Sequence, residues 1–208
     1  MMLTVYGTDR FKSAYEKGLF RHDVLTGWAM QNAGHPVTAD YLESCRFRPH
    51  DKVDEALWGG KLDWYQDWIH ATRRTDAYWQ QGWWKLLADV PGNTKVPVYI
   101  IDAWYDHHFG SAINTYASLA PETKEHSWLD IGCWNHMSQP CIAWGEQHNL
   151  ENGDIHRMLE WFDLLLKQKK QRKSGAHLCN AGGPLENAGG MACPREPYRK
   201  TFIWVKQL

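Results

Sequence analysis

Two residues whose types could carry hydrolytic chemistry each follow an apolar segment. Asp106 ends the sequence WYD and His136 ends the sequence GCWNH. If the apolar segments are neighbouring parallel strands, both residues lie at carboxyl ends, where open α/β sheets build their sites. A carboxylate that orients an imidazole, which in turn accepts a proton from a nucleophile, is the recurring pair of serine hydrolases. The pattern therefore makes Asp106 and His136 candidate catalytic residues.

A serine nucleophile is missing from this arrangement. In α/β-hydrolases the chain order is Ser, Asp, His, so the serine should precede the acid. The strained nucleophile elbow needs small residues beside the serine, and neither Ser13 in FKSAY nor Ser44 in LESCR has such a glycine setting, while Ser111 follows the acid. The residues alone thus leave a second interpretation open, an Asp106 that caps a helix and a His136 that packs in the core.

The segments around the pair predict a β-α-β order. Val96 to Ala103 is nearly continuously apolar and rich in β-branched residues, typical of a strand buried on both faces of a parallel sheet, with Pro97 tolerated only near its beginning. Helical spacing follows at Phe109, Ala112, Ile113 and Tyr116. Ser127 to Ile131 predicts the next strand, parallel to the first.

A further helix should cover this sheet. Asp154 is its predicted N-cap, and apolar residues then recur at helical spacing up to Leu166. Beyond it, a charged segment and a Gly/Pro-rich stretch over 181–197 predict a linker. Thr201 to Val205 predicts a single strand, which needs neighbours to be stable.

The first segment, up to about Lys95, shows no convincing parallel-strand pattern. Its amphipathic stretches, Val53 to Trp58 and Leu62 to Ile69, predict a mostly helical region. The chain has 13 tryptophans, most of them between Trp58 and Trp161, which indicates extensive aromatic packing or a carbohydrate-like binding surface.

Three segments together resemble one family. They are VPVYIIDAWYDHHFGSAINTYASL, WLDIGCWNHM and MLEWFDLLLK. They resemble the closing part of the catalytic domain in the α/β-hydrolase group of cocaine esterase, α-amino-acid ester hydrolase and X-prolyl dipeptidyl peptidase. There the acid lies in a G-W-Y-D-like turn and the histidine in a G-P-W-x-H-like turn. The resemblance implies an α/β fold, with Asp106 as the acid and His136 as the base of an acyl-enzyme mechanism that needs no cofactor.

The resemblance also implies a domain order. Residues 1–95 resemble, more loosely, the helical cap of the family. Residues 96–170 correspond to the C-terminal part of an α/β-hydrolase core, here a partial parallel sheet, and residues 171–208 to a linker and the start of a C-terminal β-domain. The serine and the oxyanion-hole donors would lie upstream of Met1. The chain would then be a fragment whose partners are a small ester, acyl or peptide substrate and the missing N-terminal hydrolase segment.

Substrate binding is implied for residues near the two motifs. The candidates are Trp104, His108 and Trp134, although the main expectation for the two tryptophans is that they pack beneath the acid and the base, with pocket lining as the second. Ala103 and Cys133 replace the usual glycine and proline of the two motifs, which removes no catalytic group. His107 and His108 stand where several relatives carry glycine and an aromatic residue, so the choice between ester and X-Pro peptide stays open.

Two alternative interpretations that do not involve a serine hydrolase remain open. A zinc site could be built from Cys133, His136, Cys141 and His148, although the C-x2-H-x4-C-x6-H spacing matches no familiar zinc finger. Alternatively, the chain is a non-catalytic binding module that keeps the aromatic layer and has lost the chemistry.

The composition argues against two classes of binding partner. The 23 basic residues nearly balance the 24 acidic ones without a long single-sign run, which argues against nucleic acid or an anionic membrane as a partner. No stretch approaches the length of a membrane span, and Met1 to Phe20 lacks the apolar middle of a signal peptide. We therefore expect a soluble protein, with a cytoplasmic location favoured. The 5 cysteines include no CxxC motif, so reduced thiols are expected.

Overall fold

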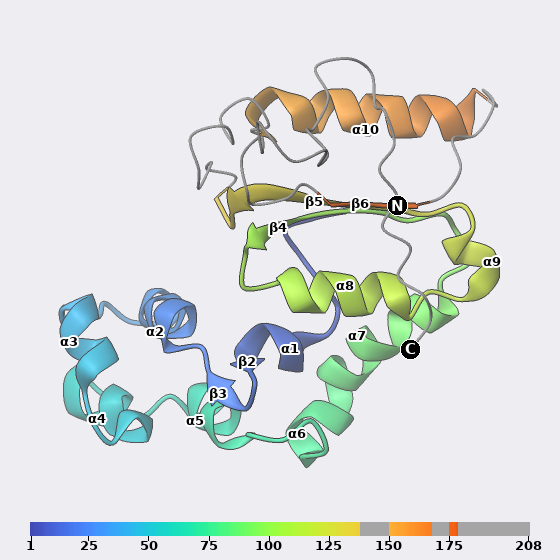
Figure 1. Cartoon of the computed structure of the whole chain (residues 1–208). Coiled ribbons are helices and arrows are strands. Elements are labelled where there is room, and N and C mark those ends of the chain that lie inside the picture. The colour runs from blue at the N-terminus through green and yellow to red at the C-terminus, as the bar shows by residue number, and fades with distance from the viewer. Residues whose placement is uncertain (138–149, 168–174, 179–208) are drawn as a thin grey trace, which may run out of the picture. The chain divides into compact units, whose positions relative to one another are not determined.

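The computed structural model describes residues 1–137, 150–167 and 175–178, which fall into two compact units. One unit consists of Met1–Thr8 together with the described residues from Val90 onward, and the other consists of Asp9–Asp89. The first unit contains a parallel sheet between helices, and the second is mainly helical (Figure 1). The α/β class predicted from the sequence is therefore confirmed.

The sheet of the first unit has four parallel strands in the order β1-β4-β5-β6. The strands are β1 (Met2–Thr4), β4 (Tyr99–Tyr105), β5 (Trp128–Asn135) and β6 (Gly175–Leu178). Both predicted strands exist and pair in parallel, as expected. The first begins at Tyr99 rather than Val96, because Pro97 has no N–H to donate; its carbonyl instead accepts a hydrogen bond from the amino group of Met1 at 2.8 Å.

Strand β1 contradicts the expectation that the first 95 residues hold no parallel strand. Its register with β4 runs from Met2 beside Tyr99 to Thr4 beside Ile101. A strand of 3 residues is too short to show an apolar pattern, and its partner lies beyond the entire helical unit. Local sequence therefore could not reveal it.

Helices cover both faces of the sheet (Figure 1). Helix α8 (Phe109–Ala117) lies on one face, where its Ala112 packs with Ile100 and Ile131. Helix α10 (Leu150–Leu166) lies on the other. There the ring of Trp161 is 5.5 Å from that of Tyr99 and 4.8 Å from that of Trp128. Both predicted helices are thus present, and α9 (Pro121–Lys124) precedes β5.

The predicted beginning of the covering helix was wrong. Helix α10 begins at Leu150, so Asp154 lies inside it and is not its N-cap. An aspartate is only a weak start signal when the residues before it can also adopt helical dihedral angles. The predicted linker over 181–197 and the predicted strand Thr201 to Val205 lie outside the described residues.

The second unit is built from short helices around an aromatic core. Its elements are α1 (Arg10–Ala14), the hairpin β2 (Tyr15–Glu16) and β3 (Leu19–Phe20), α2 (His22–Gln31), α3 (Tyr41–Arg46), the 3-10 helix η1 (His50–Lys52), α4 (Val53–Leu57), α5 (Asp63–His70), α6 (Ala77–Gln80) and α7 (Gly82–Asn93), whose last turn belongs to the first unit. The mostly helical region and its two amphipathic stretches are therefore confirmed.

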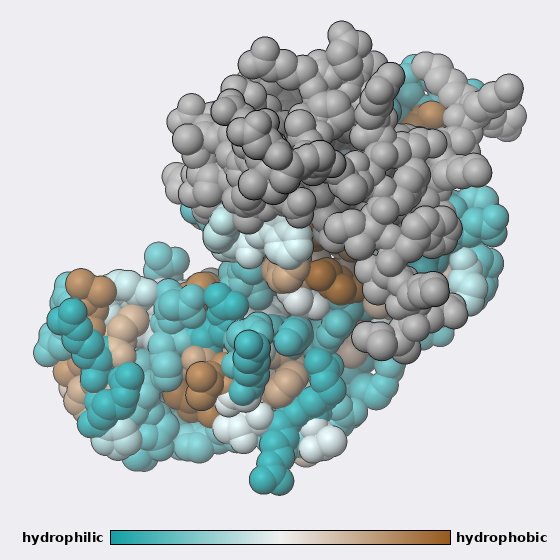
Figure 2. Space-filling model, viewed as in Figure 1, coloured by the Kyte–Doolittle hydropathy of each residue, from teal (hydrophilic) through white to brown (hydrophobic). Residues whose placement is uncertain are grey.

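Tryptophans of this unit serve packing. Trp58, Trp68 and Trp79 are buried together with Tyr15 and Tyr65. The indole N–H of Trp58 donates to the Ser44 hydroxyl at 3.0 Å, so burial leaves its polar atom satisfied. On the face shown in Figure 2, the coloured residues are mostly hydrophilic, with hydrophobic ones in small groups between them. Within the described ranges, no helix is long and apolar enough to cross a membrane.

Candidate active site

The acid and the base candidates stand at the same edge of the sheet. Tyr105, the last residue of β4, pairs with Asn135, the last residue of β5. Asp106 and His136 are the next residues of the two strands. Parallel pairing therefore brings their backbones together, as the sequence predicted.

The side chains of the pair meet in a hydrogen bond. Nδ1 of His136 lies 2.8 Å from Oδ2 of Asp106. The Asp106 side chain is 0% exposed, whereas that of His136 is 43% exposed. A carboxylate accepts only, so Nδ1 of His136 carries the proton and Nε2 is the acceptor nitrogen of the neutral ring. The predicted contact within hydrogen-bond reach is confirmed.

The remaining oxygen of Asp106 is also engaged. Oδ1 accepts the backbone N–H of His108 at 2.6 Å and lies 3.4 Å from Nδ1 of His107. The turn itself is closed by a hydrogen bond from the Phe109 N–H to the Asp106 carbonyl at 3.2 Å. Contacts at both oxygens fix the rotation of the carboxylate, and thereby the direction of the bond to His136.

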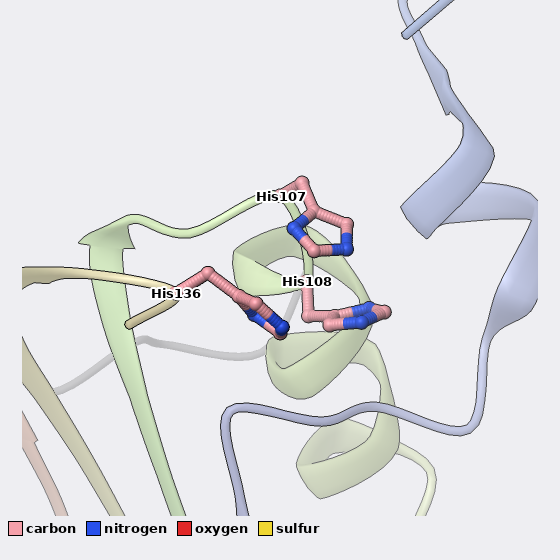
Figure 3. A group of neighbouring side chains, drawn as sticks. All are labelled: His107, His108 and His136. Atoms are coloured by element: carbon pink, nitrogen blue, oxygen red, sulfur yellow. The ribbon is translucent and has the colours of Figure 1, made fainter. Parts of the chain in front are cut away.

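Three histidine side chains gather near the turn that holds this carboxylate, and Figure 3 shows how they lie. His107 and His108 come from the turn between β4 and α8, and His136 from the end of β5. One ring nitrogen of each lies within 4.8 Å of those of the other two. The ring centroids of His107 and His136 are 4.5 Å apart, and those of His108 and His136 are 5.4 Å apart. The sequence drew attention to His108 and His136 separately, but not to their grouping with His107.

The family model of the X-Pro dipeptidyl-peptidase (S15) family matches residues 1–138 of the chain. The chain belongs to this family. The match contains both Asp106 and His136, and it includes the N-terminal helical region, whose likeness was the looser one in the sequence. No curated protein matches the chain significantly. The parallel sheet between helices agrees with the α/β-hydrolase architecture of the S15 family.

The substrate-binding candidates of this S15-family chain lie in different surroundings. His108 is buried, with its ring beside those of Tyr6 and His136. Trp104 is half-buried and its ring lies 4.9 Å from that of Phe109, on the α8 face of the sheet. Trp134 is 1% exposed and packs on the α10 face. The two tryptophans thus lie on opposite faces, and a direct role in substrate binding stays a prediction for all three.

A second buried carboxyl, that of Asp102, lies close enough to Asp106 for their charges to interact, and the sequence did not predict it. Asp102 is fully buried in β4, and its Oδ1 accepts the Ala103 N–H at 2.7 Å. Its burial, and after that the charge of Asp106, raises the pKa of Asp102 to about 7. An acidic residue inside the apolar run YIIDAW was the signal that could have revealed it.

The described serines of this S15-family chain are unsuited to be the nucleophile. Ser13, Ser44 and Ser111 are 0% to 2% exposed, and Ser127 is also buried. The hydroxyl groups of Ser13 and Ser44 donate to the backbone carbonyls of Asp9 and Asp40. Ser118 is exposed but follows α8, about 15 Å along the helix from its N-terminal end near His108, at roughly 1.5 Å per residue.

The zinc site weighed from the sequence is only partly described. Cys133 is buried, while Cys141 and His148 lie outside the described residues. Around His136 the described residues instead bring together His107 and His108.

Proposed function

We propose that Asp106 and His136 are the acid and the base of a Ser-His-Asp triad that hydrolyses ester or X-Pro peptide bonds through an acyl-enzyme. The observation that carries the proposal is the 2.8 Å hydrogen bond between His136 Nδ1 and Asp106 Oδ2, at the carboxyl ends of adjacent parallel strands. Membership of the S15 family supports a hydrolase with this arrangement.

In this proposal each group has a defined role. Asp106 holds the proton of His136 on Nδ1, so that Nε2 can take the proton of a serine hydroxyl as its oxygen attacks the substrate carbonyl. The imidazolium that forms is stabilised by the buried carboxylate and then gives its proton to the leaving group. Water, activated by the same nitrogen, hydrolyses the acyl-enzyme. Because the His108 amide and His107 fix the other oxygen, the carboxylate is already oriented before substrate binds.

We also propose that the serine comes from a segment outside the given sequence. The burial or remote position of each described serine supports this. By its place between β1 and β4, the helical unit Asp9–Asp89 corresponds to the cap that the family carries before the acid. Of the substrate-binding candidates, His108 has its ring beside the base, so we assign it to the pocket wall.

The test combines activity with active-site labelling. The chain alone should hydrolyse an activated ester no faster than its His136→Ala variant, because removing one member of a triad forfeits several orders of magnitude of rate. Joined to the upstream segment that this proposal requires, the chain should gain a serine that reacts with a fluorophosphonate probe. This labelling should disappear in His136→Ala and Asp106→Ala.

The matched control is His126→Ala, an exposed histidine of the same unit, which should leave the labelling intact. Rapid turnover by the chain alone that depends on His136 would contradict the proposal and point to an internal nucleophile. A joined protein that folds but reacts with no probe would instead favour the binding-module alternative.

A further inference from the structure

We propose that His107, His108 and His136 form a binding site for a divalent transition-metal ion, best matched by Zn²⁺. A bound ion and a catalytic proton would then compete for His136. The competition rests on the proposed function, whereas the metal site itself rests only on the cluster.

The first support is the convergence of nitrogen atoms. One ring nitrogen from each histidine lies within 4.8 Å of the other two. Tetrahedral zinc with Zn–N bonds of about 2.0–2.1 Å places its nitrogen ligands about 3.4 Å apart. Side-chain rotations that shorten each separation by up to about 1.4 Å close this difference, and His136 has room for such a rotation because its side chain is 43% exposed. Three imidazoles with a fourth position for water form a ligand set that proteins use for zinc.

The second support is the carboxylate behind the cluster. Asp106 lies 2.8 Å from Nδ1 of His136 and 3.4 Å from Nδ1 of His107. A carboxylate on the far nitrogen of a ligating histidine orients the ring and makes it a stronger ligand. Nε2 is therefore the nitrogen through which these two rings could bind a metal without losing Asp106. The buried negative charge also attracts a cation, because salt screens it less than a surface charge.

The third support is that a triad uses one histidine only. His107 and His108 are not needed to receive the serine proton, yet their ring centroids lie 3.9 Å apart and 4.5 and 5.4 Å from that of His136. Neutral imidazole is the commonest metal ligand of proteins. In this arrangement Zn²⁺ on Nε2 of His136 would occupy the lone pair that the serine proton requires, so metal binding and base catalysis exclude each other.

Binding is tested on the chain itself, without any substrate. Zn²⁺ is titrated in competition with a chromophoric chelator, and Co²⁺ is used as a visible-absorption probe of the ligand geometry. One ion should bind per chain. His107→Asn and His108→Asn should each lower the affinity at least tenfold, and Asp106→Asn about 10- to 100-fold, the range found for groups that orient metal ligands. The control His126→Asn, at an exposed position of the same unit, should bind as the wild type does.

Each variant is checked for folding by circular dichroism and thermal melting. Should a variant unfold, histidine modification mapped by mass spectrometry on the wild type replaces it: Zn²⁺ should protect His107, His108 and His136 but not His126. No saturable binding, equal affinity in His107→Asn and the control, or protection spread over all histidines would overturn the metal site. None of these outcomes bears on the triad, whose test depends on serine labelling in the absence of added metal.

Discussion

Gly7 lies directly against Ser111. A β-carbon at Gly7 would stand 2.2 Å from Oγ and 2.5 Å from the carbonyl carbon of Ser111, and 2.6 Å from the backbone nitrogen of Ala112. The segment after β1 thus passes the first turn of α8 at a distance that only glycine permits. Because α8 begins directly after His108, this contact also bears on the turn that holds Asp106.

We predict that Gly7→Ala destabilises the sheet-containing unit by about 1–3 kcal/mol, the usual cost of overpacking, because two of the three contacts are with backbone that cannot rotate away. Thermal melting measures the change. Gly92→Ala is the matched control, since its β-carbon would meet its nearest atom at 3.8 Å and the position is helical. A melting temperature unchanged in Gly7→Ala would show that the segment moves freely.

The bond between Asp106 and His136 predicts the tautomer of the ring. In the wild type the proton of neutral His136 should reside on Nδ1. Asp106→Asn can turn its NH₂ group toward Nδ1 and should therefore move the proton to Nε2, which disables the ring as a base. Nitrogen-15 NMR of labelled histidine distinguishes the two forms. Identical spectra in the wild type and Asp106→Asn would show that the bond does not persist in solution.

The carboxyl of Asp102 predicts that rising pH weakens the sheet-containing unit. Its pKa is raised from 3.8 to about 7. Between these values the folded protein keeps a proton that the unfolded chain has released. The free energy of unfolding therefore falls as pH rises, by up to about 1.4 kcal/mol per pH unit. Asp102→Asn should remove this loss, so that its stability relative to wild type improves from about pH 4 to pH 7.

Urea unfolding at several pH values measures this effect. Glu125→Gln, at an exposed carboxylate, is the control and should keep the wild-type pH dependence. Parallel curves for the wild type and Asp102→Asn would contradict the prediction.

The helical unit should respond to pH in the opposite direction. Burial first, then the charges of His22 and Arg48, lowers the pKa of His50 from 6.5 to about 4. Between these values the unfolded chain binds a proton that folded His50 does not, so stability is lost as pH falls from about 6.5 to about 4. In His50→Gln the new side chain can still form a hydrogen bond with Thr26, which lies 3.1 Å from His50. The free energy of unfolding should then fall less steeply with acid, even if it is lower overall.

Hydrogen exchange resolved by segment separates this effect from that of Asp102, since the two residues belong to different units. The protection of backbone amides against exchange within Asp9–Asp89 should fall as the pH is lowered in the wild type, and fall less steeply in His50→Gln. His126→Gln serves as the control for loss of a histidine outside that unit. An equal acid response in all three proteins would refute the role of His50.

The sequence predicted those features that depend on residues close together in the chain. The strand, turn and helix around Asp106 follow one another within a short stretch, so periodicity predicts them, and the parallel crossover to the next strand places the acid near His136. Long-range features escaped prediction for a physical reason. Strand β1 pairs across the whole helical unit, and the cluster of His107 and His136 depends on how two strand ends turn, which no local pattern encodes. The pKa of Asp102 likewise follows from burial, which a sequence only hints at.

The pairing of β1 with β4 makes the helical unit an insertion between two neighbouring strands. The pairing of β1 with β4 closes a loop in the chain. Each doubling of the length of a flexible loop adds only about 0.6 kcal/mol to the entropic free-energy cost of closing it. The inserted segment can therefore lengthen, shorten or diverge at small cost to the sheet. Both strands that carry Asp106 and His136 follow it in the chain. Changes in the length or sequence of the helical unit therefore need not alter the strands that lead to Asp106 and His136.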